Sequence, residues 1–148
     1  MDDGWFGNRN DDKSSLGDWY ADEKKLPGGL LGIAQKIKAL GLDFGIWVEP
    51  EMISPRSELA EKNPEFAISC ARREPALSRN QQVLDLTNPE VIAFVKGFLD
   101  KLLSSADISY IKWDMNRPLS GARIRPSILS RPLRYSRIYN RKISSRVI

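Results

Sequence analysis

The chain has 148 residues, 41% of them hydrophobic and 28% charged, which is typical of a folded domain. No apolar run approaches the roughly 20 residues that cross a membrane, and the N-terminus lacks the basic and apolar segments of a signal peptide. One cysteine excludes an intrachain disulfide, and the absence of histidine excludes an imidazole-based triad. These features lead us to expect a cytoplasmic protein without a membrane partner.

The net charge of +4 comes from the C-terminal end of the chain. Residues 118–148 contain eight Lys and Arg and no acid, whereas the other 117 residues contain 15 basic and 19 acidic groups. The basic segment has no clear hydrophobic period, so we expect a disordered or non-native tail over residues 118–148. Contact between this tail and nucleic acid is the weaker alternative, and it predicts that removing the tail abolishes all such binding.

In chain order, a loop rich in Gly, Asp and Asn comes first, followed by apolar segments of alternating helical and extended character. Gly41 gives a helix stop signal, Asn88 and Pro89 give a helix start, and Ser57 is a candidate cap. The expected helices cover residues 30–40, 57–62 and 88–103, and the expected strands cover residues 43–48, 82–86 and 108–113.

Alternation of strands and helices predicts an α/β fold with parallel βαβ units. Each expected strand ends in polar residues, and α/β barrels place their active sites at the C-terminal ends of their strands. Three strands, together with a strand end at Asp2 and Asp3, predict a partial (β/α)8 barrel. We expect residues 2–117 to be roughly the middle half of that barrel.

Lys112, Asp114 and Asn116 follow each other at intervals of two, so an extended segment places them on one face. An ammonium near a carboxylate lowers the pKa of the carboxyl group and keeps it ionised, which suits a nucleophile. From the spacing alone, a polar residue that merely ends a strand is the stronger interpretation of Asp114.

Asp2 and Asp3 precede Trp5 in DDGW. Carboxylates that accept hydrogen bonds from hydroxyl groups, beside an aromatic ring that stacks on a sugar, are typical of a carbohydrate pocket; the same letters also form a common turn. Arg79 precedes the second expected strand, where it can donate hydrogen bonds to a sugar or form an ordinary salt bridge with Asp85.

Glu49 and Glu51 share one face of the segment WVEPEM. They are candidate acid and base residues or metal ligands, and solvated charges at a strand end are the alternative. Without histidine, a metal site here needs oxygen ligands alone, and the spacing does not match a calcium loop.

Six motifs occur in a characteristic order. The chain resembles the microbial alpha-galactosidases of glycoside hydrolase family thirty-six over residues 2–117, and the resemblance rests on the segments DDGWFGNRNDD, LGDW, KLPGGL, GLDFGIWVEPEM, RNQQVLDLTNPEV and YIKWDMNR.

The resemblance implies residue roles. The nucleophile of the family matches Asp114, and the residues that bind galactose match Asp2, Asp3, Trp47, Arg79, Lys112 and Asn116. Asp114 would form a galactosyl-enzyme ester, and a second carboxyl group would protonate the leaving oxygen and then activate water. In the family that acid/base lies in a later glycine-rich segment, which we do not find here; Cys70 does not replace it. We therefore expect the chain by itself to be inactive.

The resemblance also implies a substrate class. It predicts hydrolysis, with retention, of terminal alpha-D-galactosyl residues from oligosaccharides such as melibiose and raffinose, without a metal or organic cofactor. Full-length relatives are expected to be homo-oligomers. The alternatives are a catalytically inactive truncated remnant, a raffinose-synthase-like transglycosylase and an alpha-N-acetylgalactosaminidase.

Overall fold

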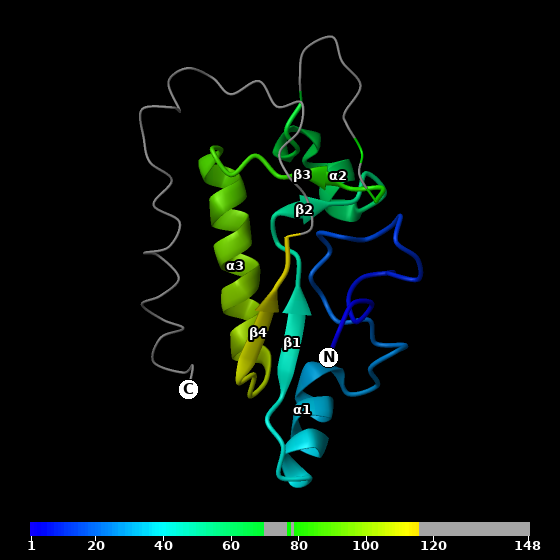
Figure 1. Ribbon diagram of the computed structural model, residues 1–148, viewed down its shortest axis with the longest axis vertical. Helices are drawn as coiled ribbons and strands as arrows, with labels where there is room; N and C mark the ends of the chain where they lie inside the picture. Colours follow the sequence, from blue (N-terminus) through cyan, green and yellow to red (C-terminus); the bar gives the residue numbers. More distant parts are fainter. Residues whose placement is uncertain (70–76, 78, 116–148) are drawn as a thin grey trace.

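The computed structural model describes residues 1–69, 77 and 79–115 (Figure 1). Asn116, Cys70 and the predicted tail over residues 118–148 lie outside this part of the chain. The described elements are α1 (Gly29–Ala39), β1 (Gly45–Val48), β2 (Met52–Ile53), α2 (Glu58–Lys62), the 3-10 helix η1 (Pro64–Phe66), β3 (Gln82–Val83), α3 (Pro89–Ser105) and β4 (Tyr110–Trp113).

Strands β1 and β4 are parallel neighbours, in the register Gly45 to Tyr110 and Val48 to Trp113. Met1 occupies a third strand position on the other edge of β1, because its amino group donates to Gly45 O at 2.6 Å and Trp47 N donates to Met1 O at 2.9 Å. Asp2 and Asp3 therefore follow a residue that is bonded to the edge of β1, which is consistent with the predicted strand end. The described parallel sheet consists of β1 and β4, and Met1 is hydrogen-bonded to the opposite edge of β1.

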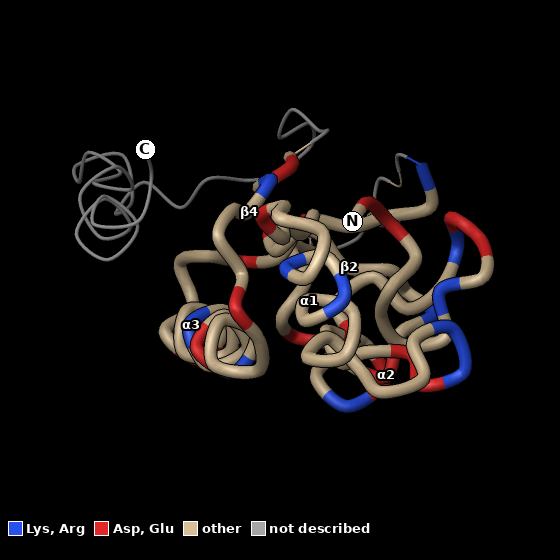
Figure 2. The backbone as a smooth tube through the Cα atoms, turned by 90° about the horizontal axis from the view of Figure 1, so that it is seen from below, with Lys and Arg blue, Asp and Glu red and all other residues tan. Residues whose placement is uncertain are grey.

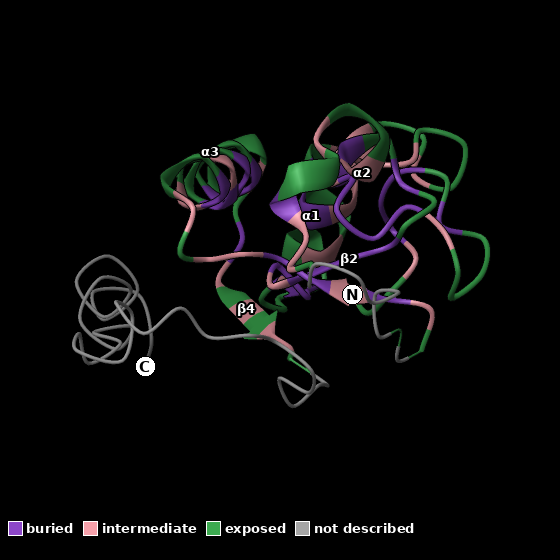
Figure 3. Cartoon of the chain, turned by 90° about the horizontal axis from the view of Figure 1, so that it is seen from above, coloured by how far each residue is buried: buried purple, intermediate pink, exposed green. Residues whose placement is uncertain are grey.

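Helices α1 and α3 lie on the same side of this sheet (Figures 2 and 3). The Asn88 side chain caps α3 by accepting from Glu90 N at 2.9 Å, and Pro89 occupies the first helical turn, as predicted. The face of α3 that turns inward buries Val91, Val95, Phe98, Leu99 and Leu102. No helix in the described residues is long and apolar enough to cross a membrane.

The prediction of a parallel barrel strand over residues 82–86 is wrong. Only Gln82 and Val83 are extended as a strand, and they pair antiparallel with β2 at the C-terminal end of β1. Residues 82–86 therefore do not add a strand to the parallel sheet of β1 and β4 in the described part of the chain. Both Val83 and Leu84 are buried, so the apolar character of the segment reflects burial beside this small antiparallel strand pair.

The segment between β1 and α3 is fixed to the N-terminal loop by a helix cap. Asp18 is buried and its carboxylate accepts from Glu58 N at 3.1 Å and from Leu59 N at 3.0 Å. Ser57 Oγ accepts from Ala60 N at 3.1 Å, which confirms the predicted cap. Together these groups bind the first three free N–H groups of α2.

Candidate active site

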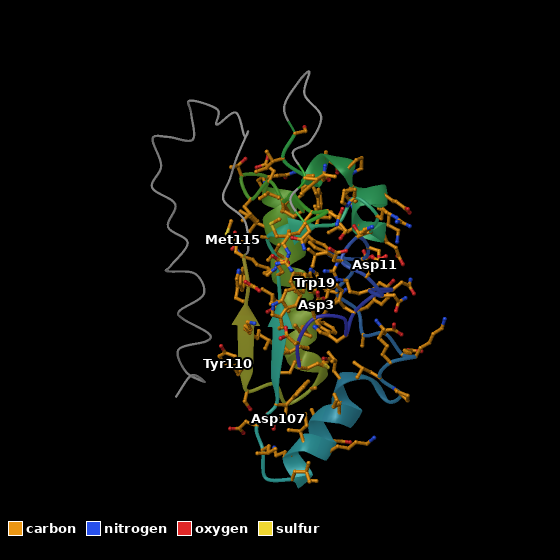
Figure 4. The ribbon with its side chains drawn as sticks, turned by 45° about the vertical axis from the view of Figure 1, so that its right-hand side comes forward. Asp3, Asp11, Trp19, Asp107, Tyr110 and Met115 are labelled. Atoms are coloured by element: carbon orange, nitrogen blue, oxygen red, sulfur yellow. The ribbon has the colours of Figure 1, made fainter. Side chains whose placement is uncertain are left out.

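Asp114 comes directly after β4 and is anchored to β1 by two hydrogen bonds. Its backbone N–H donates to Val48 O at 2.8 Å, and its carboxylate Oδ2 accepts from Trp47 Nε1 at 3.0 Å. The side chain of Asp114 is half-buried. Figure 4 labels the next residue, Met115, at the upper end of β4 and Tyr110 at its start. The carboxylate thus lies at the C-terminal end of a parallel strand, as predicted.

Lys112 and Trp47 are register partners on β4 and β1. Side chains at paired positions of neighbouring strands point to the same face, and residues two apart on a strand do so as well. Trp47, Lys112 and Asp114 therefore share one face of the sheet. Lys112 is exposed there, so an ammonium group is available on the face that carries the carboxylate. Asn116, the third member of the predicted group, lies outside the described residues.

Trp47 is buried within a group of aromatic side chains. Its ring stacks on Phe6 with centroids 6.2 Å apart and an interplanar angle of 11°, and it lies 6.4 Å from Trp19. Its backbone carbonyl accepts from Trp5 Nε1 at 2.9 Å. These contacts fix the indole that holds Asp114. They also connect the first loop of the chain to the sheet, which periodicity in the sequence did not indicate.

Asp2 and Asp3 are both exposed, directly after the strand position of Met1. The Asp2 carboxylate accepts from Asp3 N at 3.0 Å. Asp3 is held by Arg9, which donates from Nε to Oδ1 at 3.1 Å and from Nη2 to Oδ2 at 3.0 Å. Arg9 is a residue of the site that the sequence analysis missed. Its position within DDGWFGNRNDD was visible, but its pairing depends on how the loop turns at Gly4 and Gly7, both of which have positive φ.

Glu49 and Glu51 have different structural partners. Glu49 is buried and its Oε2 accepts from the buried Gln81 Nε2 at 3.3 Å, whereas Glu51 Oε1 accepts from Trp113 Nε1 at 3.0 Å. These contacts join the residues after β1 to the segment before β3 and to β4. They support a positioning role for both acids. No group of three His, Cys, Asp or Glu residues in the described part of the chain is arranged to hold a metal ion.

Arg79 is exposed and lies in a turn with an unusual backbone. Arg79 and Asn80 both have positive φ, 51° and 59°, in the left-handed region that costs free energy for residues other than glycine. Asn80 Nδ2 donates to Asp12 Oδ2 at 3.4 Å, and Gln81 follows with its contact to Glu49. The two residues that follow Arg79 are therefore anchored by side-chain hydrogen bonds, which hold the backbone from which the exposed Arg79 side chain extends.

The candidate site therefore consists of an aspartate at the end of a parallel strand, a lysine on the same face of the sheet and two exposed carboxylates that follow Met1. The family model described as Melibiase matches residues 1–139. The chain belongs to this family of alpha-galactosidases. The match extends beyond residue 117, where the motifs recognised in the sequence end.

Individual relatives agree with the family model. The chain is 48% identical over 120 residues to alpha-galactosidase AgaA of Geobacillus stearothermophilus, covering 81% of this chain and 16% of the relative. Alpha-galactosidase 1 of Pediococcus pentosaceus is 46% identical over 143 residues, which is 97% of this chain and 19% of the relative. The chain therefore spans less than a fifth of the length of these relatives.

Solved structures are also similar. A variant of AgaA from Geobacillus stearothermophilus in complex with raffinose superposes with a TM-score of 0.81 at 45% identity, covering 86% of this chain and 18% of that one. The galactosidase domain of the alpha-galactosidase-sucrose kinase AgaSK gives a TM-score of 0.78 at 47% identity, over 81% of this chain and 17% of that one.

Proposed function

We propose that this chain supplies the nucleophile and part of the sugar pocket of a retaining alpha-galactosidase. The observation that carries the proposal is the double anchorage of Asp114 on β1, through Val48 O and the Trp47 indole. A carboxylate held in one orientation at a strand end is what a covalent route requires. We further propose that Met1, β1 and β4 are neighbouring strand positions of a (β/α)8 barrel.

The proposed reaction has two steps, formation and hydrolysis of a galactosyl ester. One carboxylate oxygen of Asp114 attacks the anomeric carbon of an alpha-galactoside while the glycosidic oxygen leaves with a proton from a second carboxyl group. The resulting galactosyl ester is then cleaved by water, which gives its proton back to that carboxylate. Glu49 and Glu51 are not assigned to the second role, because both have structural hydrogen-bond partners.

Alpha-galactoside oligosaccharides such as raffinose are the proposed substrates. The support is that the AgaA structure with a TM-score of 0.81 is a complex with raffinose. The exposed carboxylates of Asp2 and Asp3 would accept hydrogen bonds from galactose hydroxyl groups, including the axial 4-hydroxyl. Lys112 and Arg79 are the proposed donors to the same sugar, together with Asn116.

The test uses a chimera in which residues 2–117 replace the corresponding segment of full-length AgaA from Geobacillus stearothermophilus. Asp114→Gly removes the nucleophile, and we expect turnover of an aryl alpha-galactoside to fall by roughly four orders of magnitude or more. Added azide should then restore cleavage and give the beta-galactosyl azide, because a single displacement inverts the anomeric centre. Glu51→Gln is the control and should cause a much smaller loss.

Two results would contradict this function. The first is near-normal turnover by the Asp114→Gly chimera. The second is labelling of Glu49 or Glu51, instead of Asp114, by a mechanism-based galactosyl inhibitor.

A further inference from the structure

Arg9 is a buried charged residue that the proposed reaction does not use. Its side chain is only 4% exposed, although it belongs to an irregular loop. Removing a guanidinium group from water costs free energy unless nearby groups compensate for the lost hydration. The partners of Arg9 therefore indicate why a charge is kept at this position.

The Arg9 side chain donates three hydrogen bonds in the described structure. Two go to Asp3 in parallel, from Nε to Oδ1 and from Nη2 to Oδ2, and the third goes from Nη1 to Ser14 O at 3.0 Å. A two-point contact between planar groups fixes the plane of the carboxylate as well as its position. Lysine, with a single ammonium group, cannot reproduce this geometry.

The carboxylate that Arg9 holds is open to solvent. The Asp3 side chain is 44% exposed, in contrast with the buried guanidinium. Each carboxylate oxygen has two lone pairs and accepts one hydrogen bond from Arg9, so acceptor capacity remains on both oxygens. The arrangement presents a carboxylate of fixed orientation to molecules arriving from solvent.

Arg9 is also connected to the nucleophile by packed groups. Its guanidinium lies over the Phe6 ring, with Cζ 5.9 Å from the centroid, and Phe6 stacks on Trp47. The Trp47 indole in turn donates to Asp114. Two stacked rings therefore connect the two carboxylates. Phe6 contacts Arg9, which holds Asp3. Trp47 stacks on Phe6 and donates to Asp114.

We infer that Arg9 is a positioning residue for recognition of the galactosyl group, acting through Asp3. It fixes the Asp3 carboxylate so that the remaining lone pairs accept a hydrogen bond from the sugar 4-hydroxyl. The inference rests on the proposed alpha-galactosidase function. A purely structural role is the competing explanation, because the bond to Ser14 also holds the loop closed.

The experiment measures specificity in the full-length chimera. The ratio of kcat/KM for an aryl alpha-galactoside to that for its 4-deoxy analogue is compared for the unmodified chimera, Arg9→Lys, Asp3→Asn and the double variant. Arg9→Lys should lower the ratio about tenfold, which is the scale of one charge-assisted hydrogen bond. In the double variant the ratio should be no lower than in Asp3→Asn alone, because Arg9 acts through Asp3.

Arg56→Lys is the matched control. Arg56 is exposed, and its backbone forms a bridge with Ser14, the residue whose carbonyl also accepts from Arg9. It should leave the ratio unchanged. If Arg9→Lys does not fold, Arg9→Ala with added guanidinium is measured, and the ratio should recover with guanidinium.

The outcomes distinguish a failure of the proposed sugar pocket at Asp3 from a failure of the proposed role of Arg9. An unchanged ratio in Asp3→Asn would overturn the assignment of Asp3 to the sugar pocket, and with it this part of the proposed function. Loss in Asp3→Asn with an unchanged ratio in Arg9→Lys, or additive losses accompanied by a lower Tm, would overturn the role of Arg9 alone. Failure of both Arg9 variants to fold would assign Arg9 to the fold and likewise overturn the inference.

Discussion

The indole N–H of Trp47 donates to the Asp114 carboxylate across two neighbouring parallel strands, at 3.0 Å. One residue further along β1, Val48 O accepts the backbone N–H of Asp114 at 2.8 Å. The first bond orients the side chain and the second places the backbone. Trp47 is itself buried and stacks on Phe6. The orientation of the Asp114 carboxylate therefore depends on the packing of these two aromatic side chains.

Trp47→Phe in the full-length chimera should keep the aromatic packing and lose the hydrogen bond to Asp114. A hydrogen bond to a charged group contributes about 1.5–3 kcal/mol, so we expect kcat for an aryl alpha-galactoside to fall about ten- to a hundredfold. The Tm should change little. An unchanged kcat would show that this bond does not orient the nucleophile.

Asp18→Ala should loosen the start of α2. The variant removes the acceptor for two backbone N–H groups, those of Glu58 and Leu59. We expect the free energy of local opening at these two amides to fall by about 1–3 kcal/mol, measured by hydrogen exchange. Glu23→Ala, at an exposed acid of the same loop, is the control. Equal exchange in both variants would exclude the cap.

Tyr20 should titrate at unusually high pH. Its hydroxyl donates to Glu58 Oε1 at 2.6 Å, and this hydrogen bond, followed by burial, raises the pKa of Tyr20 to about 12. Since the folded-state pKa is raised from 10.0, the contact contributes stability in full below pH about 10 and loses it as the pH rises through about 12.

The measurement is a difference titration of tyrosine ultraviolet absorbance between the chimera and its Tyr20→Phe variant. In Glu58→Gln the tyrosine should titrate closer to its ordinary pKa, because the carboxylate that accepts the hydrogen bond is gone. A titration of Tyr20 that is the same with Glu58 and with Gln would contradict the contact.

The helices were largely predictable from the sequence because their signals are local. Asn88, Pro89 and the apolar positions of α3 all lie within one element, and its five buried residues follow the expected helical spacing. The same holds for the cap at Ser57. Strand pairing is different, because a two-residue strand in an antiparallel pair gives no period that distinguishes it from a short buried parallel strand. The misassignment of residues 82–86 has this cause.

The proximity of candidate site residues was predictable where a sequence motif contains the residues themselves. Asp114, Lys112 and Trp47 were identified from KWDMNR and WVEPEM, and the structure brings the three together. Residues that act through contacts distant in sequence, such as Gln81 with Glu49 and Trp113 with Glu51, were not identified. The identity of these residues does not show which of them will be in contact, since the contacts form only after the loops have folded onto the strand ends.

The 148-residue chain expressed by itself should not melt cooperatively. In the described residues β4 pairs with β1 on one side only, and Tyr110 in β4 and Met115 just beyond its end are 59% and 43% exposed. In a closed barrel a further strand would pair with that edge, and a strand edge left open favours aggregation. Each large apolar side chain left unburied forfeits about 1.5–3 kcal/mol, against a total stability of about 5–15 kcal/mol for an ordinary domain.

We therefore expect strong binding of a hydrophobic dye and a broad thermal transition, whereas the chimera should melt sharply and bind little dye. A soluble monomer of the isolated chain that unfolds in one sharp transition would show that the described core is sufficient to fold without neighbouring strands.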